Sequence, residues 1–292
     1  MRIGTRGSAL ALAQARWVAD RLRGDVELVP IATSGDRGAA IADKSRWVSE
    51  LERALLAGDI DLAVHSAKDV PAELAPGLVL VAIPERADAR DAICGAESLS
   101  ALPEGATVGT SSLRRQAQIR AEREDLEVIP ITGNVDTRLR KLAGGQVDAL
   151  VLALAGLERL GRAGEADGVL DELIPAAGQG ALALEARSGF VDAAALERLV
   201  DPGATVCVGA ERELVRALGA SCNTAVGAHA RRVDDDRLEL SGWVGAPDGS
   251  AWLMDRVRLA DADFAAAGTR VAQRMLSAGA AELLAAGEAA AR

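Results

Sequence analysis

The segment Ile-Asp-Leu-Ala-Val-His-Ser-Ala-Lys-Asp, residues 60–69, joins an apolar run of strand length to a small polar turn that ends in two opposite charges. Runs of the same kind recur along the chain and predict further strands at 26–31, 78–83, 107–109 and 149–153. Helical periodicity fills the intervals between them, at 8–22, 47–56, 113–123 and 135–143. This alternation predicts an α/β architecture with largely parallel sheets that are covered on both faces.

Three segments interrupt the alternation and indicate boundaries between domains. Residues 84–91 are charged and contain a proline, and residues 174–180 form a Gly-rich crossing without periodicity. After Asp-Pro-Gly at 201–203 the chain reads as a helix, a strand at 238–244, a Pro-Asp-Gly turn, a partner strand at 251–257 and an Ala-rich helix. This last pattern predicts an α+β domain at the end of the chain.

The composition disfavours several classes of partner. The 292 residues carry a formal charge of −10, and aromatic residues make up only 2% of them. The acidity disfavours nucleic acids and anionic membranes, and the shortage of aromatic rings disfavours stacking on single-stranded nucleic acid. Acidity also serves solubility, and it leaves room for a locally basic cleft that binds small anions. We therefore expect no nucleic-acid partner and no membrane partner.

Neither a targeting segment nor a metal site is expected. No apolar run approaches the length of a membrane span, and the first residues lack the apolar core of a signal peptide. The cysteines, Cys94, Cys207 and Cys222, are few and lack CxxC spacing, so they do not suggest a secreted disulfide scaffold. These features predict a cytoplasmic protein. The two histidines, His65 and His229, form no ligand-spaced cluster for a transition metal.

Four turns between a strand and a helix combine small polar residues with a basic residue. They span residues 5–8, 65–69, 109–115 and 132–138. The first N–H groups of a helix have no partner within it, and Arg offers a planar fork that matches a carboxylate, so turns of this kind bind anions. Because such turns gather at the carboxyl ends of strands, we expect one pocket that holds several negative groups.

Each of these residues also has a purely structural interpretation. Ser8 and Ser112 fit helix N-caps, and the arginines fit solvated helix surfaces. Cys222, in the small-residue segment 219–227, fits a reachable thiol or a small buried side chain. Asp69 fits either a carboxylate that faces a cationic reaction centre or a first-turn acid stabilised by a helix dipole. No nucleotide-binding fingerprint is present to decide among these readings.

Six segments together resemble the porphobilinogen deaminase family. They occur in the order found in that family and span nearly the whole chain: IGTRGSALALAQ at 3–14, AVHSAKDVP at 63–71, VGTSSLRRQ at 108–116, GNVDTRL at 133–139, AGLERLG at 155–161 and AGQGA at 177–181. Six motifs in the right order make chance agreement negligible. The chain is therefore identified as a member of this family.

The resemblance implies two α/β domains like those of type II periplasmic binding proteins, with the active site in the cleft between them, and a small α+β domain. We expect residues 1–86 with 181–200 to form the first domain, 87–180 the second, and 201–292 the third, which anchors the cofactor. The implied activity is that of a transferase of tetrapyrrole biosynthesis, which condenses four porphobilinogen molecules head to tail into hydroxymethylbilane with loss of ammonia. The implied primer is a dipyrromethane cofactor held by a thioether to Cys222, and the family is usually monomeric.

The resemblance also assigns roles to individual side chains. Asp69 would stabilise the cation formed when ammonia leaves and would assist proton transfer. The carboxylates of the cofactor would be held by Ser66, Lys68, Thr110, Ser112, Arg114, Arg115 and Arg138. The incoming porphobilinogen would contact Arg6, Ser8, Gln14, Arg138 and Arg159.

Two departures from the family pattern stand out. Thr132 occupies the place where the family usually has Arg before Gly-Asn-Val, which removes a charge that Arg138 or Arg140 would have to replace. The lid loop of the family, at 35–47 here, is shortened and lacks its Gly-rich stretch. The residues that would serve as the lid are Lys44, Arg46 and Trp47.

Two other functions fit part of the sequence. A non-catalytic binding protein for a small polyanion would use the same cleft and the same turns, but a thioether on Cys222 would have no purpose in it. A thiol enzyme would use Cys222 as its nucleophile, but neither His65 nor His229 makes an obvious thiol–imidazole pair with it.

Overall fold

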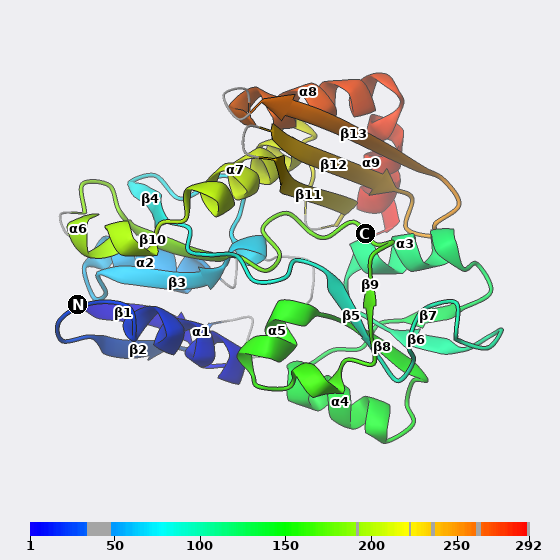
Figure 1. Ribbon diagram of the computed structural model, residues 1–292, viewed down its shortest axis with the longest axis horizontal. Helices are drawn as coiled ribbons and strands as arrows, with labels where there is room; N and C mark the ends of the chain where they lie inside the picture. Colours follow the sequence, from blue (N-terminus) through cyan, green and yellow to red (C-terminus); the bar gives the residue numbers. More distant parts are fainter. Residues whose placement is uncertain (34–47, 191–192, 222, 235–236, 261–263, 291–292) are drawn as a thin grey trace.

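Three β-sheets organise the chain, and each belongs to a separate part of the molecule (Figure 1). The computed structural model describes residues 1–33, 48–190, 193–221, 223–234, 237–260 and 264–290. Two lobes, each built on a five-stranded sheet, lie side by side, and a domain with a three-stranded sheet lies across them. Within these ranges, no helix has the length and apolar character needed to span a membrane.

The first lobe contains the N-terminus. Its strands lie in the order β2 (Glu27–Ile31), β1 (Arg2–Arg6), β3 (Leu62–Ser66), β10 (Leu182–Arg187) and β4 (Leu78–Ala82). Side chains alternate between the two faces of a strand, so Val64 packs with α1 (Ala9–Ala19) while Ala63 packs with α2 (Ser49–Ala57). Both faces of this sheet are therefore covered, as the sequence predicts. The short α6 (Ala193–Leu196) and the 3₁₀ turn η5 (Glu197–Leu199) complete the lobe.

The second lobe repeats this arrangement. Its strands lie in the order β7 (Glu127–Ile129), β6 (Thr107–Gly109), β8 (Ala149–Ala153), β5 (Asp91–Cys94) and β9 (Gly168–Leu170). Its helical elements are α3 (Leu113–Glu122), α4 (Val135–Ala143), α5 (Leu154–Arg159) and the 3₁₀ turn η4 (Ala163–Glu165). Ile119 of α3 and Leu139 of α4 belong to separate apolar clusters on the two faces of the sheet.

The prediction of largely parallel sheets is confirmed, because in each sheet four of the five strands run in the same direction and only β10 or β5 runs against them. β1 is parallel to β2 and β3, and β6 is parallel to β7 and β8. β10 is antiparallel to β3 and β4, and β5 is antiparallel to β8 and β9. β5 and β10 are the strands that the chain reaches by crossing from the other lobe. They follow no helix of their own lobe, so the crossover geometry that makes strands parallel does not constrain them.

The bounds of some strands and helices differ from the predicted bounds. The strand expected at 60–64 lies at Leu62–Ser66, and a single 3₁₀ turn, η3 (Ala67–Asp69), follows it in place of a helix. Pro71 explains the short turn, because proline disfavours helical backbone at the residue before it and Val70 is extended. The helix expected at 8–22 ends at Ala19.

In the C-terminal domain, α7 (Pro202–Ala217) and the last two helices of the chain pack on an antiparallel sheet. The remaining elements are β11 (Ala225–Asp234), β12 (Arg237–Gly245), β13 (Trp252–Ala260), α8 (Phe264–Ser277) and α9 (Ala280–Ala290). The predicted hairpin between β12 and β13 is confirmed, and Gly249 in its turn has a φ of 78°, which favours glycine. The predicted fold class, two α/β domains with a small α+β domain, is confirmed. The exact ranges given for the domains stay predictions, although the strands of each sheet fall within one of them.

A buried ion pair joins the two crossing segments to the C-terminal domain. Arg86, in the first crossing, donates to both carboxylate oxygens of Glu211 on α7, at 2.7 and 3.1 Å. Glu211 also accepts from the backbone N–H of Gly178, in the second crossing, and of Ala230 on β11, at 2.7 Å each. A carboxylate with four donors is stable without water. This pair therefore fixes the crossings that stand beside the pocket described next.

Candidate active site

A pocket opens between the two lobes, at the carboxyl ends of β1 and β3. The first lobe lines it with the ends of those strands and the segments that follow them, and the second lobe lines it with α5 and the residue before it. The polar side chains of the lining are Arg6, Ser8, Gln14, His65, Ser66, Lys68, Asp69 and Arg159. The structure thus brings together residues from the predicted turns at 5–8 and 65–69 and from the 155–161 motif.

The turn before α1 shows why Ser8 belongs to this lining. Its backbone is extended, and its hydroxyl accepts from the N–H of Ala11 at 3.3 Å, so Ser8 is the N-cap of the helix. Thr5 is buried and donates to the carbonyl of Ala11 at 3.1 Å, which holds the strand end against the helix. The structural interpretation of Ser8 is therefore correct. It leaves the hydroxyl proton free to donate to a ligand, because a serine hydroxyl both donates and accepts.

Lys68 and Asp69 stand together on the 3₁₀ turn η3. The Lys68 ammonium donates to Gln179 Oε1 at 3.3 Å. Burial, reinforced by the positive charge of Arg115, lowers the pKa of Lys68 to about 8. Asp69 is half-buried, and within the described residues its carboxylate forms no hydrogen bond or ion pair. Its oxygens are therefore available to a ligand.

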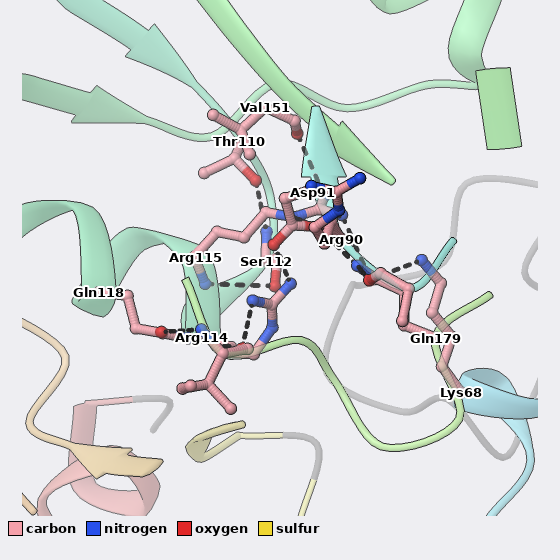
Figure 2. Close-up of polar contacts among 12 residues, drawn as sticks. Lys68, Arg90, Asp91, Thr110, Ser112, Arg114, Arg115, Gln118, Val151 and Gln179 are labelled. Atoms are coloured by element: carbon pink, nitrogen blue, oxygen red, sulfur yellow. Dashed lines mark hydrogen bonds and ion pairs between the residues drawn. The ribbon is translucent and has the colours of Figure 1, made fainter. Parts of the chain in front are cut away.

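A network around Asp91 is linked through Gln179 to Lys68, which lines the pocket (Figure 2). Arg114 donates to one oxygen of Asp91 at 2.8 Å, and Arg115 donates twice to the other, at 2.7 and 3.0 Å. Gln179 donates to the same oxygen at 2.7 Å. Burial opposes ionisation of Asp91, but the two guanidinium groups outweigh it and hold the pKa of this carboxyl well below its usual range. Two cations and one anion leave the network with a net positive charge.

This network leaves some donor capacity unused. Arg114 Nη1 donates to the carbonyl of Ile174 at 2.8 Å, whereas its buried Nε has no partner within the described residues. Burial lowers the pKa of Arg114. Gln179 Oε1 accepts from Lys68 and also from Arg115, the latter at 3.5 Å, so it connects the network to the pocket. For Arg114 and Arg115, the alternative of a solvated helix surface is wrong, because both are buried.

Thr110 and Ser112 shape the turn that carries these arginines. The Ser112 hydroxyl accepts from the N–H of Arg115 at 3.5 Å, as the N-cap of α3. The Thr110 hydroxyl accepts from the N–H of Ser112 at 3.3 Å, and Thr110 is buried. Both hydroxyls thus stabilise the conformation of the turn. Neither residue lines the pocket itself.

Arg138 and Arg159 have no carboxylate partner within the described residues. Arg138 Nε donates to the carbonyl of Gly133 at 2.8 Å, and Arg159 Nη2 donates to the carbonyl of Gly180 at 2.6 Å. Burial, together with the charge of Arg115, lowers the pKa of Arg138 to about 10, and burial lowers that of Arg159. Both cations are therefore positioned by backbone oxygens and form no ion pair with the described residues.

The surroundings of Thr132 differ from the sequence-based expectation. Arg140 is exposed and donates to the hydroxyl of Thr137 at 3.2 Å. Lys141, one residue further along, donates to the carbonyl of Thr132 at 3.2 Å. Lys141, rather than Arg140, thus brings positive charge to the position of the missing arginine.

Four predicted residues, Cys222, Lys44, Arg46 and Trp47, lie outside the described residues. The neighbours of Cys222 are held by the final helix. Asn223 donates to Glu288 Oε2 at 3.2 Å, and its N–H donates to the Ser221 hydroxyl at 2.9 Å.

Sequence reasoning missed Asp91, Gln179 and the pair His65–Glu185. Asp91 and Gln179 lie at the two crossings, which the sequence marks only as boundaries between domains. Asp91 directly precedes an apolar run, and Gln179 lies between two glycines. The sequence therefore gives only a weak indication that these two polar side chains are buried. His65 Nε2 and Glu185 Oε2 are 3.0 Å apart on neighbouring strands, a contact across 120 positions that no local pattern reveals.

Comparison with known proteins identifies the family. Residues 1–195 match the porphobilinogen deaminase dipyrromethane cofactor binding domain, and residues 205–277 match the porphobilinogen deaminase C-terminal domain. The chain belongs to the porphobilinogen deaminase family. The porphobilinogen deaminase of Thiobacillus denitrificans is 48% identical, with 97% of each chain covered, and that of Xanthomonas axonopodis pv. citri is 50% identical, with 98% of each covered.

These matches confirm the family read from the sequence, the transferase activity of porphobilinogen deaminases and the dipyrromethane cofactor. The pocket and the Asp91 network both lie within the range that matches the cofactor binding domain. A solved periplasmic domain, BvgS VFT2 of Bordetella pertussis, is 18% identical over 70% of this chain and 90% of that one, with a TM-score of 0.41.

Proposed function

We propose that this chain condenses four porphobilinogen molecules, one at a time, into hydroxymethylbilane on a dipyrromethane primer joined by a thioether to Cys222. One observation carries the proposal. Among the described residues that line the pocket between the lobes, Asp69 is the single carboxylate, beside the cations Arg6, Lys68 and Arg159, and the pocket adjoins a second buried group of cations around Asp91. A growing oligopyrrole with an acetate and a propionate on each ring requires such a surplus of positive charge.

The residues of the site fit a dipyrromethane with its carboxylates. Arg114 Nε is buried without a partner, and the guanidinium groups of Arg138 and Arg159 pair with no carboxylate of the described residues. A ligand carboxylate would satisfy these donors. We assign the carboxylates of the cofactor to Ser66, Lys68, Thr110, Ser112, Arg114, Arg115 and Arg138. We assign the incoming porphobilinogen to Arg6, Ser8, Gln14, Arg138 and Arg159.

When bound, the cofactor supplies a terminal pyrrole whose free α-carbon is the nucleophile. The protein's contribution lies in charge and position. Loss of ammonia from porphobilinogen leaves positive charge on its ring, and the free carboxylate of Asp69 stabilises that charge. The same oxygens can accept a hydrogen bond from a pyrrole N–H and assist proton transfer. Lys68, whose ammonium is tied to Gln179, holds a ligand carboxylate beside Asp69.

We further propose that the protein acts in the cytoplasm as a monomer, and that Lys44, Arg46 and Trp47 close over the bound substrate. The scarcity and spacing of the cysteines support the first part. Light scattering of the purified protein at several concentrations tests the monomer. A mass of two chains would contradict it.

Intact-protein mass spectrometry tests the function most directly. We expect the purified protein to carry the mass of two extra pyrrole units, the variant Cys222→Ser to lack them, and only the former to release hydroxymethylbilane from porphobilinogen. An unmodified wild type that still binds polyanions would favour a binding protein. An unmodified wild type inactivated by a thiol reagent would favour a thiol enzyme.

A further inference from the structure

His65 and Glu185 form a buried pair at the pocket, and the function proposed above gives neither a role. Their side chains are 4% and 0% exposed, and they lie on the antiparallel neighbours β3 and β10. His65 Nε2 is 3.0 Å from Glu185 Oε2. The other oxygen, Glu185 Oε1, is buried and has no hydrogen-bond partner within the described residues. A carboxylate removed from water in this way depends on its close polar contact, which is His65.

The geometry determines what the imidazole presents to the pocket. An ionised Glu185 can only accept, so it favours the neutral imidazole tautomer that carries its proton on Nε2. The ring nitrogen Nδ1 of the neutral form is then an acceptor. Nδ1 forms no hydrogen bond with the described residues, and His65 lines the pocket whereas Glu185 does not. The pair thus offers the pocket an acceptor that is supported by a buried negative charge.

The substrate has one group for which the assignments above name no partner. The cations Arg6, Lys68 and Arg159 suit its two carboxylates, and Asp69 suits its pyrrole nitrogen. The aminomethyl group is an ammonium at neutral pH and requires an acceptor of its own. It leaves as neutral ammonia: the carbon–nitrogen bond breaks, its electron pair goes to nitrogen, the nitrogen keeps three protons, and the positive charge passes to the ring.

We propose that His65, oriented by Glu185, accepts a hydrogen bond from the ammonium of the substrate and so selects an aminomethylpyrrole and positions its leaving group. The proposal rests on the proposed function, because it requires porphobilinogen in this pocket. His65 keeps its protonation state throughout, and Glu185 is a positioning residue that acts through it.

Two other charged side chains approach the pair from neighbouring helices. Glu52, on α2, accepts from the N–H of Ala75 at 3.4 Å, and burial, with the charge of Glu185, raises the pKa of Glu52. Arg212, on α7, donates to the backbone carbonyls of Val70 and Pro71, at 3.1 and 2.7 Å. Neither forms a hydrogen bond with His65, which makes Glu52→Gln a matched control for Glu185→Gln.

Nitrogen NMR of the imidazole rings in the cofactor-loaded protein tests the orientation. The chain has two histidines, so the variant His229→Gln assigns the remaining signals to His65. We expect the neutral form with the proton on Nε2, a shift of the Nδ1 signal when porphobilinogen is added, and loss of this tautomer preference in Glu185→Gln but not in Glu52→Gln. A doubly protonated ring at neutral pH, or a proton on Nδ1, would overturn the proposal.

Two substitutions separate contact with the substrate from contact with Glu185. The amide of His65→Asn reaches about as far as Nδ1, whereas that of His65→Gln reaches about as far as Nε2. The probe is an analogue in which a methyl group replaces the aminomethyl group. The preference is the ratio of the dissociation constants of this analogue and of porphobilinogen. We expect His65→Gln to lower this ratio roughly 10- to 100-fold, the range for a hydrogen bond to a charged group. His65→Asn should retain part of the preference.

The outcomes distinguish this inference from the function on which it rests. A wild type that carries dipyrromethane and turns over porphobilinogen, with an unchanged preference in a folded His65→Gln variant, would refute the role of His65 alone. A wild type without the cofactor and without turnover would refute the proposed function itself.

Discussion

The pocket and the Asp91 network are neighbours built from the same residue types, yet they use charge differently. In the pocket, the carboxylate of Asp69 has no hydrogen-bond or ion-pair partner within the part of the chain that the structure describes, and the guanidinium of Arg159 donates to a backbone oxygen. In the network, Arg114 and Arg115 are buried and share the carboxylate of Asp91. The difference teaches that positive charge alone does not define the site. Charged side chains without a partner in the protein are available to ligands. Charged side chains that pair with one another instead hold the surrounding segments in position.

The largest effect on activity is expected from Asp69→Ala. Because its carboxylate has no partner within the described residues, its loss should leave the fold intact and remove the stabilisation of the cationic ring. We expect kcat to fall roughly 10²- to 10⁴-fold, with an unchanged thermal unfolding midpoint. The exposed Glu73→Ala serves as the control and should retain full turnover. Near-normal kinetics of Asp69→Ala would remove the catalytic role of this residue.

The largest effect on stability is expected from Asp91→Asn. It leaves two buried guanidinium groups without their counter-ion, which typically costs about 3–5 kcal/mol in the free energy of unfolding. Denaturant unfolding measures it. The control is Asp125→Asn, which breaks a partly exposed pair with Arg123 and should change much less. If both substitutions have equally small effects, the network does not fix geometry as we infer.

Lys68 connects the two regions, and its titration should depend on the cofactor. Without the cofactor, its pKa of about 8 lies below the ordinary 10.5, so the folded protein releases this proton before the unfolded chain does. The stability of Cys222→Ser should therefore rise between pH 8 and 10.5, by at most about 1.4 kcal/mol per pH unit. Carboxylates of the cofactor favour charged Lys68, so the cofactor-loaded protein should show a smaller rise.

Thermal unfolding as a function of pH measures this difference. The double variant Cys222→Ser with Lys68→Met should lose the rise. The control, Cys222→Ser with Lys141→Met, changes a partly exposed lysine that donates to a carbonyl, and it should keep the rise. An equal rise in the presence and absence of Lys68 would assign the effect to another group.

The smallest effect is expected from Thr132→Arg, which adds a cation at the edge of the site. At this exposed position, one more ion pair with a substrate carboxylate should lower KM or raise turnover by roughly 2- to 5-fold, the range for a pair screened by solvent. Thr132→Gln supplies length without charge and should have little effect. No change in either constant would mean that Lys141 and Arg138 already replace the missing arginine.

Features that depend on neighbours in the sequence were predictable. The turns at 5–8 and 109–115 follow from a small polar residue at the start of a helical pattern, and Ser8 and Ser112 are the N-caps that this pattern predicts. The hairpin at 247–249 follows from its turn residues in the same way. The motifs around Lys68, Asp69 and Arg114 led to the family and to the residues that line or adjoin the pocket.

Other features depend on contacts that no local pattern encodes. β11, with its alanines, glycine and charges, is a strand because β12 pairs with it along its length. Asp91 is 23 positions from Arg114, and Glu185 is 120 positions from His65. Burial and pairing of these groups arise only when the chain crosses between the lobes and returns.

The sequence by itself thus determined the α/β class, the helix starts and the family, because these depend on short-range patterning and on whole motifs. Only the tertiary structure decided which cations are neutralised and which stay available, and which strands run antiparallel. The physical reason is that a charge acquires its partner, and loses its water, through packing between segments distant in the sequence.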